Sequence, residues 1–528
     1  MRSQRTGVAK ELAKSAQAGV LCPHINWENV KLPASSIKQA THFALSLTLA
    51  IVSTSFPLFA KTPNVVIIFI DDMGYADIGP FGATNIRTPN LDRMAKQGRK
   101  FTDFIVSSAV CSASRSALLT GCIHERIGFR GALGPQSKMG IAASEVTLGE
   151  ICKQKGYATA CFGKWHLGHH PKFLPSRHGF DVYYGLPYSN DMWPFHPEDV
   201  AAREKNPKRK PNYPPLPMIE GTRIVDEEVT GEDQTLMTVE YTQRAVKFIK
   251  EHAADPFFVY MPHSMVHVPL YSSPMTAGKS GTGPYGDAVS EIDWSVGQVL
   301  DTLAELKLEE QTLVVFTTDN GPWLSYGSHA GSAGPLREGK GTSWEGGIRV
   351  PTLMQWKGTI PEGSRCDQLA STIDLLPTVA AAIDAQLPSH TIDGKNIRSL
   401  MVSNDAKSPH ASIPCYYADG QLQAIRNDRW KLVFPHTYRS IDNQKGKSDG
   451  TPIAYVNKKI ESIELYDLDA DVGETKNVAE ANPTVVQQLK SEADRWRAEL
   501  GDSLTGVTGN SVRPADKLLD GEPTLTGQ

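Results

Sequence analysis

Continuous apolar runs alternate with amphipathic stretches along most of the chain, and each run ends in polar or ionisable side chains. The run at 64–72, NVVIIFIDD, is rich in β-branched residues and stops at two aspartates. This pattern is typical of a strand buried on both faces of a parallel sheet. The segments 157–168, 256–267 and 312–322 predict further strands, each followed by a polar loop, and amphipathic stretches between them predict helices. The alternation predicts an α/β domain whose chemistry gathers along one edge of a doubly wound sheet.

The pattern changes in two places. Residues 194–234 are rich in proline and charge and show no apolar period, which predicts a long surface loop. Beyond residues 404–409, short alternating runs predict antiparallel strands, and 482–500 predict an amphipathic helix with a proline near its start. We therefore expect four parts, which are a leader at 1–60, a large α/β domain at 61–403, a smaller α+β domain at 404–510 and a poorly ordered tail at 511–528.

The first sixty residues are basic and then apolar, and the apolar part, 42–60, is diluted by serine and threonine. This composition predicts a secretory signal sequence, and hence a periplasmic or secreted protein. A buried helix or a membrane anchor is the alternative, but Pro57 interrupts the run and no lipobox cysteine follows it. We expect no stable membrane span once the signal is removed.

The overall composition narrows the class of protein. There are 54 Lys and Arg against 58 Asp and Glu, and 40% of the residues are hydrophobic, which is typical of a soluble globular enzyme and argues against a nucleic-acid binder. The seven cysteines include Cys22 in the leader and show no CxxC metal spacing. They leave room for a single disulfide, whose partners the sequence does not name.

Two acidic pairs follow predicted strands. Asp71 and Asp72 end the first run, and Asp319 and Asn320 end a later one, so a parallel sheet would bring both pairs to one edge. A buried group of carboxylates needs a cation, and ligands that are all oxygen favour Ca²⁺ or Mg²⁺ over zinc. Taken alone, either pair is more often a turn or a helix cap.

Cys111 begins a small, hydroxyl-rich stretch with Arg115 four residues later, so both side chains share one face of a helix that starts near Ser112. The free N–H groups of a helix start favour an anion and would acidify a thiol. A small buried thiol is the alternative. The basic residues Lys164, His166, His267 and Lys340 follow strands or lie in glycine-rich segments, where they could attract an anionic substrate or simply be structural.

The stretch CSASRSALLTG, from Cys111, resembles the signature of type I sulfatases, Cys-x-Pro/Ala-x-Arg followed by a small residue and LLTG. Five companion motifs occur in the family order, and the resemblance covers about Lys61 to the C-terminal helix. These motifs are IIFIDDMGYADIG, GKWHLG, PHSMVHVP, FTTDNGP and GKGTSWEGGIRVP.

The resemblance implies an alkaline-phosphatase-like fold, a mixed and mostly parallel sheet between helices, and oxidation of Cys111 to Cα-formylglycine. It also implies a calcium ion held by Asp71, Asp72, Cys111, Asp319 and Asn320. A geminal hydroxyl of the hydrated aldehyde can expel sulfate by C–O cleavage, whereas a serine or cysteine sulfate would need a second attack at sulfur.

The resemblance also implies the roles of the basic residues. Arg115 and the metal would keep the attacking oxygen reactive, and Asp319 would take its proton. Lys164 and Lys340 would hold sulfate oxygens. His267 would protonate the departing sugar oxygen, and His166 would take the last proton so that sulfate leaves.

Ala113 stands where much of the family has proline, a form that resembles substrates of the bacterial radical-SAM maturase, so we expect that enzyme as a partner. The substrate is expected to be a sulfated galactose unit of a polysaccharide such as carrageenan or a galactosaminoglycan. Two alternatives are a phosphodiesterase or phosphonate monoester hydrolase of the same superfamily, and a non-catalytic sulfated-glycan binder if Cys111 is not converted. The candidate substrate-binding residues are His178, Asn190, Asp191, His196 and His329.

Overall fold

The computed structural model describes residues 62–525. The predicted leader at 1–60 lies outside these residues. Within the described part of the chain, no helix is long and apolar enough to cross a membrane.

A ten-stranded sheet forms the centre of the molecule, and its five middle strands are parallel. Residues of β1 (Asn64–Ile70) pair one to one with those of β10 (Thr312–Thr318), so the two strands end side by side. On the other side of β1, the parallel series continues through β9 (Phe257–Pro262), β5 (Ala158–Phe162) and β6 (Val182–Gly185). The predicted parallel sheet is confirmed in these strands.

The sheet becomes mixed toward both edges. On one side β11 (Thr352–Gln355) runs antiparallel to β10 and to β2 (Arg99–Phe101), which pairs in parallel with β12 (Ser364–Cys366). On the other side β7 (Met218–Glu220) and β8 (Arg223–Asp226) add an antiparallel hairpin. The mixed, mostly parallel sheet agrees with the expected fold class.

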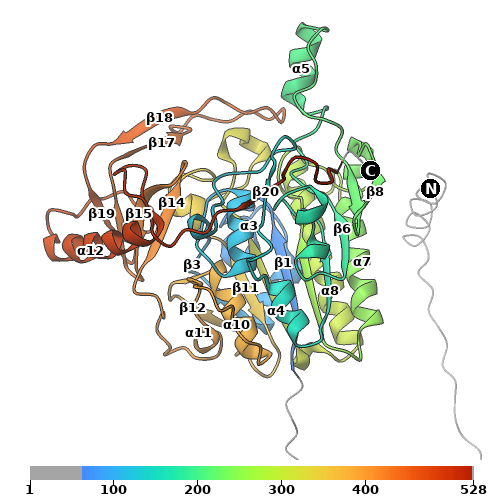
Figure 1. The fold of residues 1–528 in the computed structure, drawn as a ribbon, viewed down its shortest axis with the longest axis horizontal. Helices are drawn as coiled ribbons and strands as arrows, with labels where there is room; N and C mark the ends of the chain where they lie inside the picture. The colour runs from blue at the N-terminus through green and yellow to red at the C-terminus, as the bar shows by residue number, and fades with distance from the viewer. Residues whose placement is uncertain (1–61, 526–528) are drawn as a thin grey trace, which may run out of the picture. The chain divides into compact units, whose positions relative to one another are not determined.

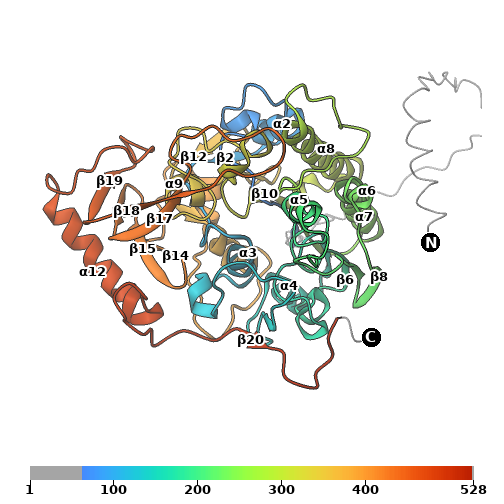
Figure 2. The ribbon, with the colours of Figure 1, turned by 90° about the horizontal axis from the view of Figure 1, so that it is seen from above.

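Helices cover both faces of this sheet (Figure 2). Val65, Ile67 and Phe69 of β1 belong to one apolar cluster, whereas Val66 and Ile68 belong to another, because successive side chains of a strand point to opposite faces. This is why the sequence of β1 is continuously apolar. The helices of the first layer include α3 (Cys111–Thr120), α4 (Leu148–Gln154) and α10 (Leu375–Ala382), and those of the second include α2 (Pro89–Gln97), α7 (Met237–Glu251) and α8 (Pro284–Glu305).

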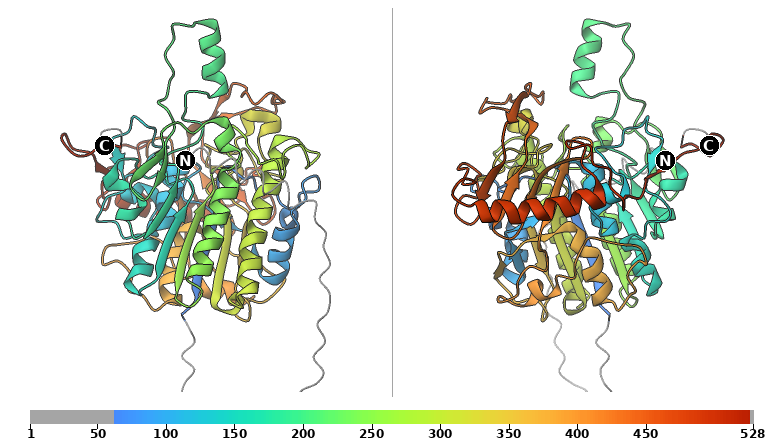
Figure 3. Two further views of the ribbon diagram at one scale, coloured as in Figure 1. Left: turned by 90° about the vertical axis from the view of Figure 1, so that its right-hand side faces the viewer. Right: turned by 60° about the vertical axis from the view of Figure 1, so that its left-hand side comes forward.

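The C-terminal region forms the smaller α+β part that the sequence predicts (Figures 1 and 3). Leu489 and Trp496 of α12 (Pro483–Leu500) pack on an antiparallel sheet, and Pro483 occupies the first turn of the helix. That sheet consists of β14 (Ile413–Tyr417), β15 (Gln421–Arg426), β16 (Trp430–Val433) and β19 (Glu464–Asp467). A hairpin of β17 (His436–Ser440) and β18 (Val456–Ile460) lies beside it. The exact boundary between the two domains stays a prediction.

The prediction of a long loop at 194–234 is wrong. The segment contains α5 (Pro197–Lys205), the β7–β8 hairpin and α6 (Gly231–Gln234). Local signals specify these short elements without any apolar period. Pro197 lies in the first turn of α5, and Thr230 and Asp233 form a capping box at α6.

The prediction of a poorly ordered tail is also wrong over residues 511–525. Here β20 (Asp516–Lys517) pairs with β4 (Met139–Gly140), and Leu518 and Leu525 are buried. The tail lacks apolar periodicity because only scattered side chains anchor it. The six cysteines among the described residues are all buried free thiols, so none of them forms a disulfide with another.

Candidate active site

Both acidic pairs meet at the carboxyl edge of the parallel strands. Asp71 and Asp72 follow β1, Asp319 and Asn320 follow β10, and the pairing of Ile70 with Thr318 sets them side by side. The Asp72 N–H lies 3.2 Å from Asp319 Oδ1, and Asn320 Nδ2 lies 2.7 Å from Asp72 Oδ1. All four side chains are buried, so the sequence prediction that they converge is correct in geometry.

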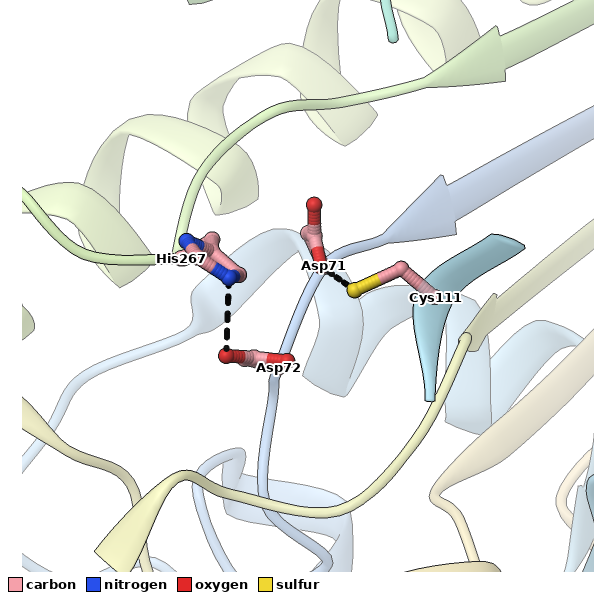
Figure 4. A group of neighbouring side chains, drawn as sticks. All are labelled: Asp71, Asp72, Cys111 and His267. Carbon is pink, nitrogen blue, oxygen red and sulfur yellow. Dashed lines mark hydrogen bonds and ion pairs between the residues drawn. The ribbon is translucent and has the colours of Figure 1, made fainter. Parts of the chain in front are cut away.

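Cys111 is the first residue of α3, directly after the N-cap Val110, and it is 2% exposed. Its Sγ lies 3.5 Å from Asp71 Oδ1 (Figure 4). It also lies 3.4 Å from Lys340 Nζ. Burial, followed by the Asp71 carboxylate, raises the pKa of this thiol, so the expectation of an acidified cysteine is wrong.

Arg115 lies one helical turn after Cys111 and is fully buried. Its Nε and Nη2 donate to Asp319 Oδ2 at 3.1 and 2.8 Å, and Nη2 lies 3.2 Å from Asp71 Oδ2. Its Nη1 donates to the Lys164 carbonyl at 2.9 Å. One guanidinium therefore links the two acidic strand ends to the loop after β5 and fixes their relative positions.

Two lysines complete the cluster of charges. Lys164 Nζ forms an ion pair with Asp71 and lies 3.0 Å from Ser189 Oγ. Lys340 Nζ lies 2.6 Å from Asp72 Oδ1 and 4.4 Å from the centre of the Trp323 ring. With Arg115 and Asp319, the buried cluster holds three carboxylates and three cationic side chains, so their formal charges cancel.

The environment divides the carboxylates into two kinds. Burial disfavours the charge of Asp71, but Lys164 and Arg115 outweigh it and hold the pKa of this carboxyl well below its usual value. For Asp319, burial and the Asp71 carboxylate prevail over Arg115 and raise the pKa to about 7. The site thus places a permanently charged carboxylate beside one that can exchange a proton near neutral pH.

Two histidines flank the cluster. His267 Nε2 lies 3.6 Å from Asp72 Oδ2, and its Nδ1 lies 2.6 Å from the Val268 carbonyl oxygen. His166 Nε2 lies 2.9 Å from the Leu133 carbonyl oxygen, and its buried Nδ1 has no hydrogen-bond partner. Burial lowers the pKa of both imidazoles, with Lys340 adding to the effect at His267 and Lys164 at His166.

Ligand-capable atoms of Asp71, Asp72, Cys111 and His267 lie within 4.8 Å of one another (Figure 4). The metal ligands predicted from the sequence do not include His267, which lies in the loop after β9. Asn320 Oδ1 is buried beside the same acids and has no hydrogen-bond partner. An oxygen that is free of protein partners among carboxylates fits a hard cation.

Two of the five predicted substrate-binding residues lie near the charged cluster. For Asp191, burial opposes ionisation, but His267 and then the Ser189 hydrogen bond and Lys164 lower its pKa, so its carboxylate interacts electrostatically with the cluster. Asn190 is buried and donates to Gln234 Oε1 at 3.1 Å. Ser189, which supports Lys164, was missed by the sequence analysis because a lone serine in a loop carries no pattern.

The other three candidates make their contacts elsewhere. His178 is fully buried and stacks on Trp165 at 6.1 Å, which is a packing role. His196 accepts a hydrogen bond from the Glu198 N–H at the start of α5. His329 ends a 3₁₀ segment, Leu324–His329, and faces Gly450 of the β17–β18 loop. No contact joins these three imidazoles to the acid cluster among the described residues.

The comparisons with known proteins agree with this geometry. Residues 63–385 match the family model described as sulfatase, and 408–516 match the one described as the C-terminal region of aryl-sulfatase. The chain belongs to the sulfatase family. Human arylsulfatase A is 37% identical to this sulfatase over 491 residues, covering 87% of this chain and 92% of the relative. Human N-acetylgalactosamine-6-sulfatase is 41% identical over 487 residues, covering 88% of each chain.

The structure is also similar to solved structures of sulfatases. The PsFucS1 sulfatase from Pseudoalteromonas sp. matches with a TM-score of 0.73 and 26% identity, covering 83% of this chain and 90% of that one. Ps i-CgsB in complex with k-i-k-neocarrahexaose matches with a TM-score of 0.66 and 27% identity, covering 83% and 93%. A phosphonate monoester hydrolase of Agrobacterium radiobacter, at 17% identity and a TM-score of 0.53, shares the fold. The protein is a sulfuric ester hydrolase with an alkaline-phosphatase-like fold.

Proposed function

We propose that this sulfatase removes sulfate from a galactose-type unit of a sulfated polysaccharide, using residue 111 as formylglycine and a calcium ion. The observation that carries the proposal is the convergence of three buried carboxylates and three buried cations on residue 111. The named sugar sulfatase among the relatives and the carbohydrate bound to Ps i-CgsB support the substrate class. Asn190, Asp191 and Trp323 supply the polar and aromatic surroundings that suit a sugar.

The state of Cys111 supports the proposed oxidation. Because burial keeps the thiol protonated, the unmodified side chain is a poor nucleophile at neutral pH. When formed, the aldehyde hydrate would supply an oxygen nucleophile in its place. We propose a radical-SAM maturase as the modifying enzyme, and a periplasmic or secreted location, on the sequence features alone.

The donor set fits calcium. Asp71, Asp72, Asp319 and the unpartnered Asn320 Oδ1 offer oxygen ligands, with residue 111 as the fifth group. When bound, the ion would supply Lewis-acid stabilisation of negative charge at the reacting oxygens. Because the six side-chain charges cancel, a divalent ion would give the site a net positive charge that attracts a sulfate ester.

Three cations are placed to hold the sulfate group. Lys164, Lys340 and Arg115 are each no more than 6% exposed, and carboxylates or carbonyls fix each of them. Fixed, desolvated cations stabilise charge that develops in a transition state without first having to reorganise. We assign the lysines to the sulfate oxygens and Arg115 to the nucleophilic oxygen at residue 111.

Proton transfers are assigned from the hydrogen bonds. Asp319, which Arg115 holds beside the acids after β1, would accept the proton of the nucleophile. His267 donates from Nδ1 to the Val268 carbonyl, so Nε2, the nitrogen that faces Asp72, would first have to take up a proton and would then pass it to the departing sugar oxygen. His166 donates from Nε2 to Leu133, so its free Nδ1 is the base for the final step.

The test compares defined sulfated galactose and N-acetylgalactosamine sugars with nitrophenyl sulfate and nitrophenyl phosphate diesters. We expect sulfate release from at least one sugar sulfate, with kcat/KM above that for the diester. Faster diester cleavage would replace the proposal with a phosphodiesterase. The mass of the peptide that contains residue 111 is measured in parallel, because an unconverted cysteine with tight glycan binding would indicate a non-catalytic receptor.

A further inference from the structure

A basic projection stands out beside the proposed site. Helix α5 and the chain that returns from it, together residues 194–217, extend from the end of the molecule at which the parallel strands finish (Figures 1 and 3). We call this segment the basic arm. Its nine-residue helix is about 13 Å long, so the tip lies well beyond the body of the domain.

The tip of the arm, residues 203–210, carries five Lys or Arg and a single Glu, although the whole chain has a formal charge of −4. Lys205, Lys208 and Lys210 are exposed, and no acidic side chain of the described residues lies within ion-pair distance of their ammonium groups. Unpaired cations of one sign create a local positive potential that attracts polyanions.

The arm is a folded element and not a loose charged loop. The Asp199 carboxylate, 1% exposed, lies 3.6 Å from Arg203 Nε on the helix and 3.7 Å from Arg209 Nε on the returning chain. It also accepts from the Asn212 N–H at 3.1 Å. This buried carboxylate therefore joins the two limbs of the arm.

Prolines stiffen the returning limb. Five of them lie in the eleven residues from 207 to 217, and proline-rich segments favour extended, semi-rigid conformations. The lysines between them are thus presented at a smaller entropic cost than on a flexible loop.

The root of the arm adjoins the proposed site. It begins directly after Asn190 and Asp191, and the charges of Glu198, at the start of α5, and of Asp191 act on the Tyr326 hydroxyl. The Tyr326 ring packs against Trp323 at 4.9 Å, and Trp323 packs against His267 at 5.3 Å. If one sulfated sugar unit of a polysaccharide occupies the site, the neighbouring sugar units would thus lie close to the arm.

We propose that the basic arm binds the anionic groups of a sulfated polysaccharide outside the unit being cleaved, so that long chains are held better than single sugars. This inference rests on the proposed function for its substrate class. It assigns to Lys205, Lys208 and Lys210 a role in binding the polymer, and none in the chemistry.

The test uses the full-length protein with the triple change Lys205→Gln, Lys208→Gln and Lys210→Gln. The matched control changes three exposed lysines of other surfaces, Lys395, Lys407 and Lys476, to Gln. With sulfated galactose oligosaccharides of about twelve sugars at low salt, we expect KM to rise roughly tenfold in the arm variant, with kcat unchanged. KM for a sulfated monosaccharide and for nitrophenyl sulfate should not change. For the long oligosaccharide, about 0.5 M NaCl should remove the difference in KM between the arm variant and the wild type.

An unchanged KM for the long oligosaccharide, or an equal rise in the control variant, would overturn the proposal. Direct titration with carrageenan and with its desulfated form keeps the test separate from the proposed function. The wild type could release no sulfate from any sugar. If the arm variant then bound carrageenan more weakly than the wild type and the control variant did not, the proposed role of the arm would still be supported. Arm-dependent binding to anionic lipid vesicles without binding to carrageenan would instead assign the arm to a membrane surface.

Discussion

His166 and Ser112 are joined through the backbone of a single residue, Leu133. The Leu133 carbonyl lies 2.9 Å from His166 Nε2, and the Leu133 N–H donates to Ser112 Oγ at 3.0 Å. Because a carbonyl oxygen only accepts, Nε2 carries the proton and Nδ1 keeps its lone pair. The residue next to Cys111 thus sets the position and tautomer of a histidine that lies beyond β5.

The first prediction concerns the hydrogen bond from the Leu133 N–H to Ser112 Oγ. Ser112→Ala leaves the buried Leu133 N–H without a partner, which costs about 1–3 kcal/mol of unfolding free energy. We expect kcat to fall as well, because His166 loses its fixed position. Urea unfolding and steady-state kinetics measure the two effects. The mass of the peptide that contains residue 111 shows whether Cys111 is converted to the same extent in the variant and the wild type.

Ser114→Ala is the matched control for that prediction. Ser114 lies on the same helix, is equally buried, and its Oγ has no hydrogen-bond partner. The change should leave unfolding and kcat nearly unaltered. Equal losses of unfolding free energy and kcat in Ser112→Ala and Ser114→Ala would show that the hydrogen bond from Leu133 to Ser112 does not cause them.

A second prediction concerns Arg115. Arg115→Lys keeps the charge but loses the two donors on Asp319 Oδ2 and the bond to the Lys164 carbonyl. We expect kcat to fall by roughly 10²-fold or more, with a smaller change in KM. Kinetics with nitrophenyl sulfate test this, and activity within threefold of the wild type would argue against a fixed role for the guanidinium.

Stability should depend on pH through Glu291, a buried carboxyl on α8 that is not part of the acid cluster. Burial outweighs its bonds from Ser273 and raises the pKa of this carboxyl to about 7, from an ordinary value of 4.5. The native state therefore binds the proton more tightly, and this contribution is present below about pH 4.5 and is lost as pH rises through 7.

Glu291→Gln removes that titration. Between pH 4.5 and 8, we expect the unfolding free energy of the wild type to fall relative to the variant by on the order of 3 kcal/mol. Urea unfolding at a series of pH values measures the difference. If the difference in unfolding free energy between the wild type and Glu291→Gln stayed constant across this pH range, the pKa of Glu291 would not be raised by folding.

Glu345 should be important for stability because it joins the two domains. Its fully buried carboxylate lies 2.7 Å from Arg426 Nη1 and 3.1 Å from Lys431 Nζ, both on the C-terminal sheet. Burial opposes its charge, but these cations lower its pKa to about 2. Glu345→Gln leaves two buried cations short of a partner, which should cost about 3–5 kcal/mol. Thermal unfolding is compared with that of Glu461→Gln, whose ion pair with Lys459 is exposed.

Removal of the metal gives a fifth prediction. If Ca²⁺ is bound at a hundred times its Kd, chelation should lower the unfolding free energy by about 2.7 kcal/mol, and added Ca²⁺ should restore it. Asn320→Ala removes the unpartnered oxygen and should weaken that response. Thermal unfolding with and without chelator provides the measurement. An identical Tm under both conditions would speak against a bound ion.

The sequence predicts the centre of this molecule well and its surroundings less well. Asp71 and Asp319 could be placed together because parallel strands of equal register end at one edge, a relationship that follows from periodicity. The thiol chemistry of Cys111 could not be predicted, because the helix start favours a thiolate while burial and Asp71 oppose it more strongly. The arm at α5 was missed because caps, prolines and one buried carboxylate specify it without an apolar repeat.

The pairing of β20 with β4 has a consequence for the order in which the molecule is completed. Gly140 of β4 is followed by Ile141, whose N–H donates to the Leu167 carbonyl, one residue after His166. The strand that pairs with this segment is synthesised long after it, because Asp516 lies 376 positions beyond its partner Gly140 (516 − 140). During synthesis, β4 therefore stays without this strand partner until residue 517 has left the ribosome, long after the histidine loop itself has emerged.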